Sequence, residues 1–144
     1  MSELSKIPRG WSSSSFGEVA KYYNGRCFKS SEWEEQGLPI IRIQNLNKHD
    51  ASFNYTRQVF EEQYRVRNDD LLFSWSASLD VYIWKRGDAW LNQHIFRVEP
   101  HAGIEKRYLY YSLQNHLSDL RAQTHGAGMV HITKKKFEET PILL

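Results

Sequence analysis

Three stretches in the middle of the chain are patterned as β-strands. A continuous apolar run covers residues 71–75, which is typical of a strand buried on both faces. A second strand is predicted over residues 81–85, and Gly87-Asp88 after it is a turn signal. Apolar and polar residues then alternate over residues 90–98, which predicts a third strand that Pro100 ends.

The segment before these strands combines a further strand with polar connections. Residues 38–44 are rich in β-branched side chains and are predicted to form a strand. Alternation along it places Arg42 and Gln44 on one face. Residues 45–54 are polar and typical of a loop, and residues 56–64 predict a short helix because their apolar positions do not alternate.

Helical periodicity marks two other stretches. Ser15 and Glu18 have the spacing of a capping box, and the apolar residues that follow predict a short helix that reaches Tyr23 and stops at Gly25. The clearer helix covers residues about 104–123. Its apolar stripe, with Tyr110 beside it, consists of Leu109, Leu113, Leu117 and Leu120.

The end of the chain alternates short elements. We expect a loop over residues 126–128, a short strand over 129–132, a last helical turn capped by Thr133, and a strand-like end over 141–144. Strands in the middle with helices around them predict an α+β fold. The expected architecture is one domain with a curved, mostly antiparallel sheet, flanked by short helices and one longer amphipathic helix.

Composition limits the class of protein. The 144 residues suit one folded domain, and 40% hydrophobic content with 14% aromatic residues argues against disorder. Cys27 is the only cysteine, which excludes an intrachain disulfide and a cysteine-rich zinc site. No apolar run approaches the ~20 residues that span a bilayer, so the expectation is a soluble cytoplasmic protein.

The formal charge of +2 permits nucleic-acid binding only if the basic groups gather on one face. The one dense basic cluster is Lys134-Lys135-Lys136. The alternative interpretation of this cluster is a solvated helix face. None of the four prolines lies in the Asn/Asp-Pro-Pro-aromatic loop of amino-methyltransferases, and no nucleotide-binding loop, Gly-x-Ser-x-Gly elbow or His-Glu-x-x-His motif occurs. The six histidines lack metal-ligand spacing, so no metal site is predicted.

Three segments carry the residue types that read base edges and hold phosphates. Each segment also has a structural interpretation without DNA. The first could be a polar strand edge and loop, Trp75 in the second could be a core residue, and the third could be a plain helix-to-strand loop. A separate trio, Asn92, Gln93 and His94, is predicted to form a buried polar network that supports these loops. The candidate DNA-binding residues are Arg42, Gln44, Asn45, Asn47, Lys48 and His49; Ser74, Trp75, Ser76 and Ser78; and Gly128, Met129, His131, Thr133 and Lys134.

A family resemblance over almost the whole chain rests on four stretches: Pro39 to Leu46, Asp70 to Ser78, Trp90 to Val98 and Gly126 to Thr133. They closely resemble the target recognition domain of the DNA specificity (S) subunit of type I restriction-modification enzymes. Residues 7–11 are similar to the motif with which such domains begin, which implies the N-terminal of two domains, although the long helix that normally follows is not present.

This resemblance implies a domain without catalytic residues, which recognises one half of a bipartite target in double-stranded DNA. It implies methyltransferase (M) subunits and a restriction (R) subunit as partners. S-adenosylmethionine, ATP and Mg are then expected on those partner subunits, and no cofactor is expected in this chain.

Two other function classes stay open. Five Trp and eight Tyr fit an aromatic-rich carbohydrate- or ligand-binding module, whose binding would be insensitive to salt. The second class is a metal-dependent nuclease built from Asp69, Asp70, Asp80 and Lys85. A DNA reader instead predicts an affinity that falls steeply with salt.

Overall fold

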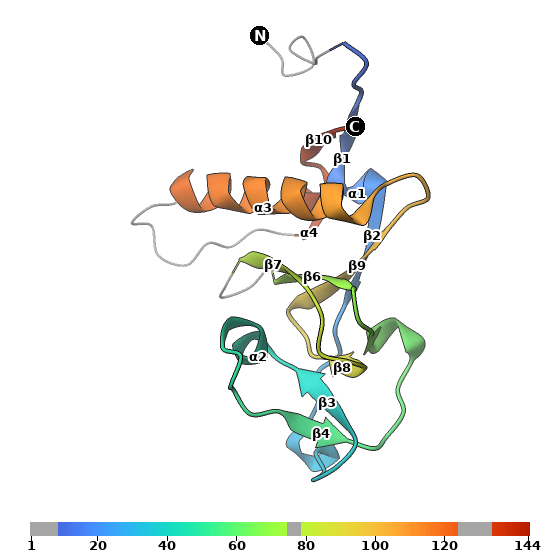
Figure 1. Cartoon of the computed structure of the whole chain (residues 1–144), viewed down its shortest axis with the longest axis vertical. Coiled ribbons are helices and arrows are strands. Elements are labelled where there is room, and N and C mark those ends of the chain that lie inside the picture. Colours follow the sequence, from blue (N-terminus) through green and yellow to red (C-terminus); the bar gives the residue numbers. More distant parts are fainter. Residues whose placement is uncertain (1–8, 75–78, 124–133) are drawn as a thin grey trace.

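The computed structural model describes residues 9–74, 79–123 and 134–144, and its elements are labelled in Figure 1. The strands are β1 (Ser13–Ser15), β2 (Ala20–Asn24), β3 (Leu38–Ile41), β4 (Asn54–Thr56), β5 (Arg65–Val66), β6 (Leu71–Ser74), β7 (Asp80–Ile83), β8 (Ala89–Leu91), β9 (Ile95–Pro100) and β10 (Pro141–Leu143). The helices are α1 (Phe16–Val19), α2 (Ile43–Asn47), α3 (Lys106–Gln123) and α4 (Lys134–Glu138), with 3-10 turns η2 (Ser30–Glu32) and η3 (Glu62–Tyr64).

The predicted α+β class with mostly antiparallel strands is confirmed, and the strands are divided among three sheets. A central antiparallel sheet has the order β2-β9-β6-β7. A mixed sheet has the order β4-β3-β8-β5, in which β3 and β8 run parallel. β1 pairs with β10, so the serine run near the N-terminus forms a strand that the sequence pattern did not reveal.

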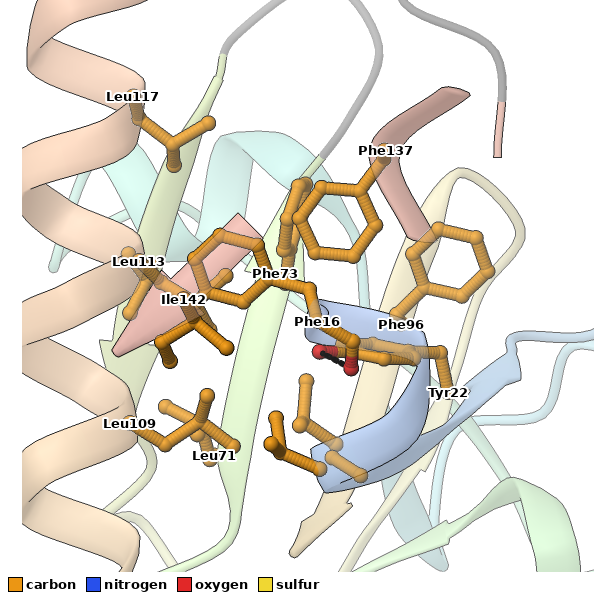
Figure 2. Packing of buried hydrophobic residues seen from close by; sticks show 14 of the residues in the cluster. Phe16, Tyr22, Leu71, Phe73, Phe96, Leu109, Leu113, Leu117, Phe137 and Ile142 are labelled. Atoms are coloured by element: carbon orange, nitrogen blue, oxygen red, sulfur yellow. Dashed lines mark hydrogen bonds between the residues drawn. The ribbon is translucent and has the colours of Figure 1, made fainter. Parts of the chain in front are cut away.

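Two apolar clusters cover the two faces of the central sheet. β6 shows why: Leu71 and Phe73 belong to the cluster that contains α3, whereas Leu72 belongs to the cluster that contains Trp84 and the mixed sheet. Alternate residues of a strand point to opposite faces, so a strand covered on both sides is apolar throughout. Figure 2 shows the α3-side cluster, and Figure 1 shows the mixed sheet at the other end of the molecule.

The long helix and the central strands agree with the sequence patterns. α3 buries Leu109, Leu113 and Leu117 against the central sheet, and the Leu120 side chain lies outside the described part of the chain. β6, β7, α4 and β10 occur where the patterns predict them. The predicted loop, strand and cap over residues 126–133 fall outside the described residues. Within the described ranges, no helix is long and apolar enough to cross a membrane.

The predicted helix that reaches Tyr23 is wrong. α1 ends at Val19, and β2 begins at Ala20 because the chain pairs there with β9, Tyr22 opposite Val98. The Ser15 hydroxyl donates to the Glu18 carboxylate at 3.0 Å and makes no cap bond to the backbone. Pairing with a long strand therefore overrides a weak local helix signal.

Two further predictions upstream of β6 are wrong. The strand predicted over residues 38–44 ends at Ile41, and α2 follows, so Arg42 and Gln44 do not share a strand face. Thr56, where the predicted helix over residues 56–64 would begin, is instead the buried last residue of β4, and within residues 57–64 the chain forms only the turn η3. Pairing of β3 with β4 imposes the extended conformation at Thr56.

The strand predicted over residues 90–98 is two strands in different sheets. β8 belongs to the mixed sheet and β9 to the central sheet, so the chain must turn between them. His94 has the left-handed φ of 72° that such a turn needs, and its side chain is exposed. Asn92 and Gln93 are half-buried, so the predicted buried network of these three side chains is wrong.

Glu34 links the mixed sheet to the segment after η2. Its carboxylate accepts hydrogen bonds from the Arg57 backbone N–H (2.7 Å), the Arg57 Nε (3.0 Å) and the Thr56 hydroxyl (3.2 Å). The Arg57 backbone bond, followed by the Arg57 side chain, holds the pKa of Glu34 below its usual range.

A carboxyl whose pKa is lower in the folded than in the unfolded protein stabilises the fold at pH values above its unfolded-state pKa. This stabilisation is lost as pH falls through the folded-state pKa. We expect Glu34→Gln to lower the free energy of unfolding near pH 7. This difference should shrink steadily below about pH 4, where the wild-type carboxyl also becomes protonated. Urea denaturation at several pH values checks this. A difference between variant and wild type that is independent of pH would contradict the role of the charge.

Candidate nucleic-acid interface

About half of the predicted contact residues can be located. Ser74 is buried within β6, so its hydroxyl does not face solvent. The remaining described members belong to the α2 segment, which carries most of them, and to the start of α4. Those outside the described residues are Trp75, Ser76, Ser78, Gly128, Met129, His131 and Thr133.

Arg42 and Asn45 shape the loop that follows α2. Asn45 is 2% exposed; its Oδ1 accepts the Arg42 N–H at 3.0 Å, and its Nδ2 donates to the carbonyls of Ala51 (3.3 Å) and Ser52 (3.0 Å). Arg42 Nη2 donates to the same Ser52 carbonyl at 2.9 Å. These hydrogen bonds hold Ser52 close to α2 and so position the residues between Asn45 and Ser52.

The loop so positioned presents its other polar residues to solvent. Gln44, Asn47, Lys48 and His49 are all exposed. Asn47 Oδ1 accepts a hydrogen bond from the Tyr82 hydroxyl at 2.6 Å, which joins α2 to β7 although 35 residues separate the two. Amides, an ammonium and an imidazole gathered in this way are the groups that read base edges and hold phosphates.

A groove of about 400 Å³ lies between α2 and the end of β7. Asn47 and His49 line one wall, and Tyr82, Lys85 and Arg86 line the other. No carboxylate is among its described lining residues; Lys85 is paired with Asp69 outside the groove, and Arg86 is the lining cation without an acidic partner.

Arg86 is held at this groove by aromatic rings. Its guanidinium lies 4.7 Å from the Phe53 ring centroid and 5.7 Å from that of Trp84. Trp84 is itself fixed by its Nε1–H, which donates to the Gly87 carbonyl at 2.6 Å. Cation–π contacts orient a guanidinium without neutralising it. Tyr82 and Arg86 were missed from the sequence; the only signal was the pair of basic residues before the Gly87 turn.

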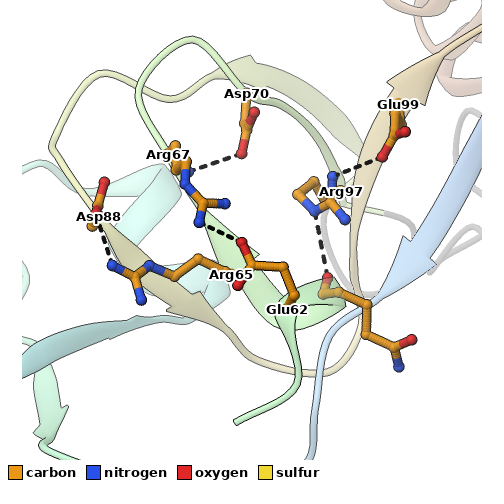
Figure 3. Close-up of polar contacts among 8 residues, drawn as sticks. Glu62, Arg65, Arg67, Asp70, Asp88, Arg97 and Glu99 are labelled. Carbon is orange, nitrogen blue, oxygen red and sulfur yellow. Dashed lines mark hydrogen bonds and ion pairs between the residues drawn. The ribbon is translucent and has the colours of Figure 1, made fainter. Parts of the chain in front are cut away.

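Five arginines elsewhere in the described part of the chain have acidic partners. Figure 3 shows Arg65 with Asp88 (2.7 Å), Arg67 with Glu62, and Arg97 with Glu99 (3.3 Å). Arg26 pairs likewise with Glu32 and Arg57 with Glu34. Within the described part of the chain, Lys48 and Arg86 form no ion pair with a carboxylate. Among the described residues, Arg86 in the α2–β7 groove and Lys48 beside it are thus cations without an acidic partner, as are Lys106 and Arg107 at the start of α3.

Lys134 packs on the other face of the central sheet. Its ammonium lies 5.7 Å from the ring centroid of Phe96, which belongs to the α3-side cluster, whereas α2 packs against the opposite cluster. The described residues therefore do not bring Lys134 next to α2. Whether the three predicted segments contact DNA together stays a prediction.

The acidic residues proposed for a nuclease do not converge. Asp70 precedes β6 and its carbonyl accepts the Trp84 N–H, whereas Asp80 pairs with Ser74 at the other end of the same strand pair. Four residues of strand separate these ends by about 13 Å. Among the described residues, no three His, Cys, Asp or Glu side chains are grouped so that they could hold a metal ion.

The aromatic residues do not form one exposed platform among the described residues. Trp84 and Trp90 are buried in the core. Trp11 (47% exposed) lies against Tyr108 near β1 and β10, whereas Trp33 (45% exposed) follows η2. Figure 1 shows these two segments at opposite ends of the molecule. This placement gives no support to a carbohydrate-binding surface of stacked aromatic rings.

Comparison with known proteins gives one consistent family. Residues 8–144 match the model of the type I restriction modification DNA specificity domain. The chain is 31% identical over 140 residues to the type I restriction enzyme EcoBI specificity subunit of Escherichia coli, and this match covers 95% of the chain and 29% of that protein. It is 27% identical to the MjaVIII specificity subunit of Methanocaldococcus jannaschii, over 96% of the chain and 33% of that protein.

Solved structures share the fold. The HsdS subunit from Thermoanaerobacter tengcongensis superposes with a TM-score of 0.71 at 22% identity, covering 96% of this chain and 34% of that one. The S subunit from M. genitalium gives a TM-score of 0.64 at 11% identity, covering all of this chain and 36% of that one. The chain thus spans about a third of the length of the relatives it matches.

Proposed function

This chain belongs to the type I restriction modification DNA specificity domain family, and we propose that it is the part of a specificity subunit that recognises one half of a bipartite DNA target. In this proposal the domain is not itself an enzyme. It selects the DNA sequence on which methyltransferase and restriction subunits act. S-adenosylmethionine, ATP and Mg would be bound by those partners.

The observation that carries the proposal is the α2–β7 groove, whose described lining includes Arg86, a cation without an acidic partner, and no carboxylate, while Lys85 in the same lining pairs with Asp69. Duplex DNA presents a dense row of phosphates, so a surface of uncompensated cations attracts it while a surface of paired arginines does not. Lys48 and Arg86 then contact phosphates. Gln44 and Asn47 are of the type that reads adenine, and the partners named in this proposal would methylate adenine.

Arg86→Ala tests this assignment in the complete specificity subunit assembled with its methyltransferase subunits. The target is first identified by sequencing the adenines that the complex methylates on random DNA. We expect the affinity of Arg86→Ala for the target to fall about five- to tenfold near 0.1 M salt, because one contact releases about 0.9 counterion. The slope of log affinity against log salt should decrease by about 0.9, while the methylated motif is unchanged.

Arg67→Ala is the matched control, because Arg67 is also exposed but paired with Glu62. It removes the same charge and should leave affinity and salt slope close to wild type. Equal losses for the two variants would mean that only net charge matters, and the groove would not be the interface. Methylation without sequence preference by a well-folded wild-type complex would contradict recognition itself.

A further inference from the structure

A second hollow adjoins the α2–β7 groove on the other side of β7. It has a volume of about 470 Å³ and lies between the end of β7 and the first turns of α3. Ile83 and Lys85 line both hollows, so the two are separated only by the end of this strand. Figure 1 shows β7 lying between α2 and α3. A ligand that crosses the end of β7 therefore meets both hollows in succession.

Three cations surround the second hollow. Lys85 pairs with the Asp69 carboxylate, and Lys106 Nζ donates to the Asp69 carbonyl at 2.7 Å. Arg107 is exposed beside them on α3. The Lys85 hydrogen bond and charge, followed by the charges of Lys106 and Arg107, hold the pKa of Asp69 below its usual range.

The balance of charge at this hollow stays positive. Asp69 and Glu105 are the acidic residues among its described lining, against Lys85, Lys106 and Arg107. Lys85 already satisfies Asp69, and Lys106 donates to a neutral carbonyl. Tyr110 adds a half-buried phenol to the same wall. Ammonium, guanidinium and hydroxyl donors are the groups that hold phosphate oxygens.

We propose that this second hollow binds a phosphodiester of the DNA that flanks the recognised bases. The inference rests on the proposed function, because it extends the DNA path from the α2–β7 groove across Lys85 to Lys106 and Arg107. A contact of this kind is independent of sequence. It would add affinity for DNA longer than the half-site, while the choice of bases stays with the first groove.

Arg107→Glu tests the proposal, because this side chain is exposed and makes no hydrogen bond or ion pair within the described residues. The complete subunit with its methyltransferase partners is titrated with two duplexes carrying the target. One ends close to the recognised bases, and the other extends about ten base pairs beyond them on each side, roughly one helical turn. Lys21→Glu is the control, because Lys21 is exposed on β2 at the opposite edge of the central sheet.

We expect Arg107→Glu to weaken binding of the long duplex at least about fivefold near 0.1 M salt and to lower its salt slope by about one. Binding of the short duplex and the methylated motif should match wild type. Arg107→Ala should act in the same direction with a smaller loss, and Lys21→Glu should change neither duplex by as much.

Three results would overturn the inference. Equal losses on both duplexes would place Arg107 at the bases or implicate net charge alone, and unchanged binding of both would leave the hollow without a DNA contact. Loss of subunit assembly in the absence of DNA would assign the hollow to an acidic protein partner. The loss of target affinity expected for Arg86→Ala is measured separately and does not depend on these outcomes, so the inference can fail while the proposed function stands.

Discussion

Gly25→Ala is expected to destabilise the domain by about 3 kcal/mol or more. A Cβ atom at Gly25 would lie 1.8 Å from the carbonyl oxygen of Asn92 and 2.7 Å from that of Leu91. Both are backbone atoms, so no side-chain rotation relieves the clash. The Gly25 N–H also donates to the Ile95 carbonyl at 2.9 Å, which holds β2 against the turn between β8 and β9.

Gly103→Ala is the control for this substitution. Gly103 has a φ of +87°, and nothing lies within 4 Å of the position that an alanine methyl group would take, so alanine there meets conformational strain but no clash. We expect a loss of about 1–2 kcal/mol. Urea denaturation followed by circular dichroism compares the two variants. A Gly25→Ala loss no larger than that of Gly103→Ala would mean that the two backbone segments separate at little cost.

Phe137→Ala is expected to lower the free energy of unfolding by about 3–5 kcal/mol. The Phe137 ring lies between three elements, with ring centroids 5.2 Å from Phe16, 5.1 Å from Tyr22 and 4.8 Å from Phe73 (Figure 2). It is the buried residue of α4, so the short helix has no other buried anchor among its described residues. Removing the ring leaves a cavity that rigid neighbours fill only in part.

Phe137→Leu distinguishes the contribution of buried side-chain volume to stability from that of the aromatic ring geometry. It keeps most of the buried volume and should recover more than half of the loss, whereas Val59→Ala at an exposed position should change stability by less than about 0.5 kcal/mol. Thermal and urea unfolding of the three variants provide the measurement. If Phe137→Ala resembled Val59→Ala, α4 would not be docked on the α3-side cluster.

Periodicity along the chain was enough to predict the elements whose conformation does not depend on a distant pairing partner. The leucines at 109, 113 and 117 recur at helical spacing, and α3 follows because that spacing puts them on one face. The apolar run of β6 predicted a strand covered on both sides, as found. The family resemblance also came from the order of residues along the chain, and the match over residues 8–144 confirms it.

Local patterns failed where a distant partner sets the conformation. Ala20 to Tyr23 have helical spacing, but the pairing of β2 with β9 makes them a strand. Residues 90–98 alternate as one strand, but their two halves pair in different sheets and need a left-handed residue, His94, between them. Alternation puts Arg42 and Gln44 on a strand, but the Asn45 side chain caps and closes the turn into α2.

The candidate site depends on such partners almost entirely. The groove forms because Asn47 meets Tyr82, 35 residues away, and its charge depends on which cations lack a carboxylate. Arg67 and Arg86 are the same residue type in the sequence, yet Glu62 neutralises the first while two aromatic rings orient the second. The spacing of hydrophobic residues is a local property, so it can be read directly from the sequence. Pairing of charges and the meeting of loops are set by packing between residues far apart in the chain, and they appear only once the chain has folded.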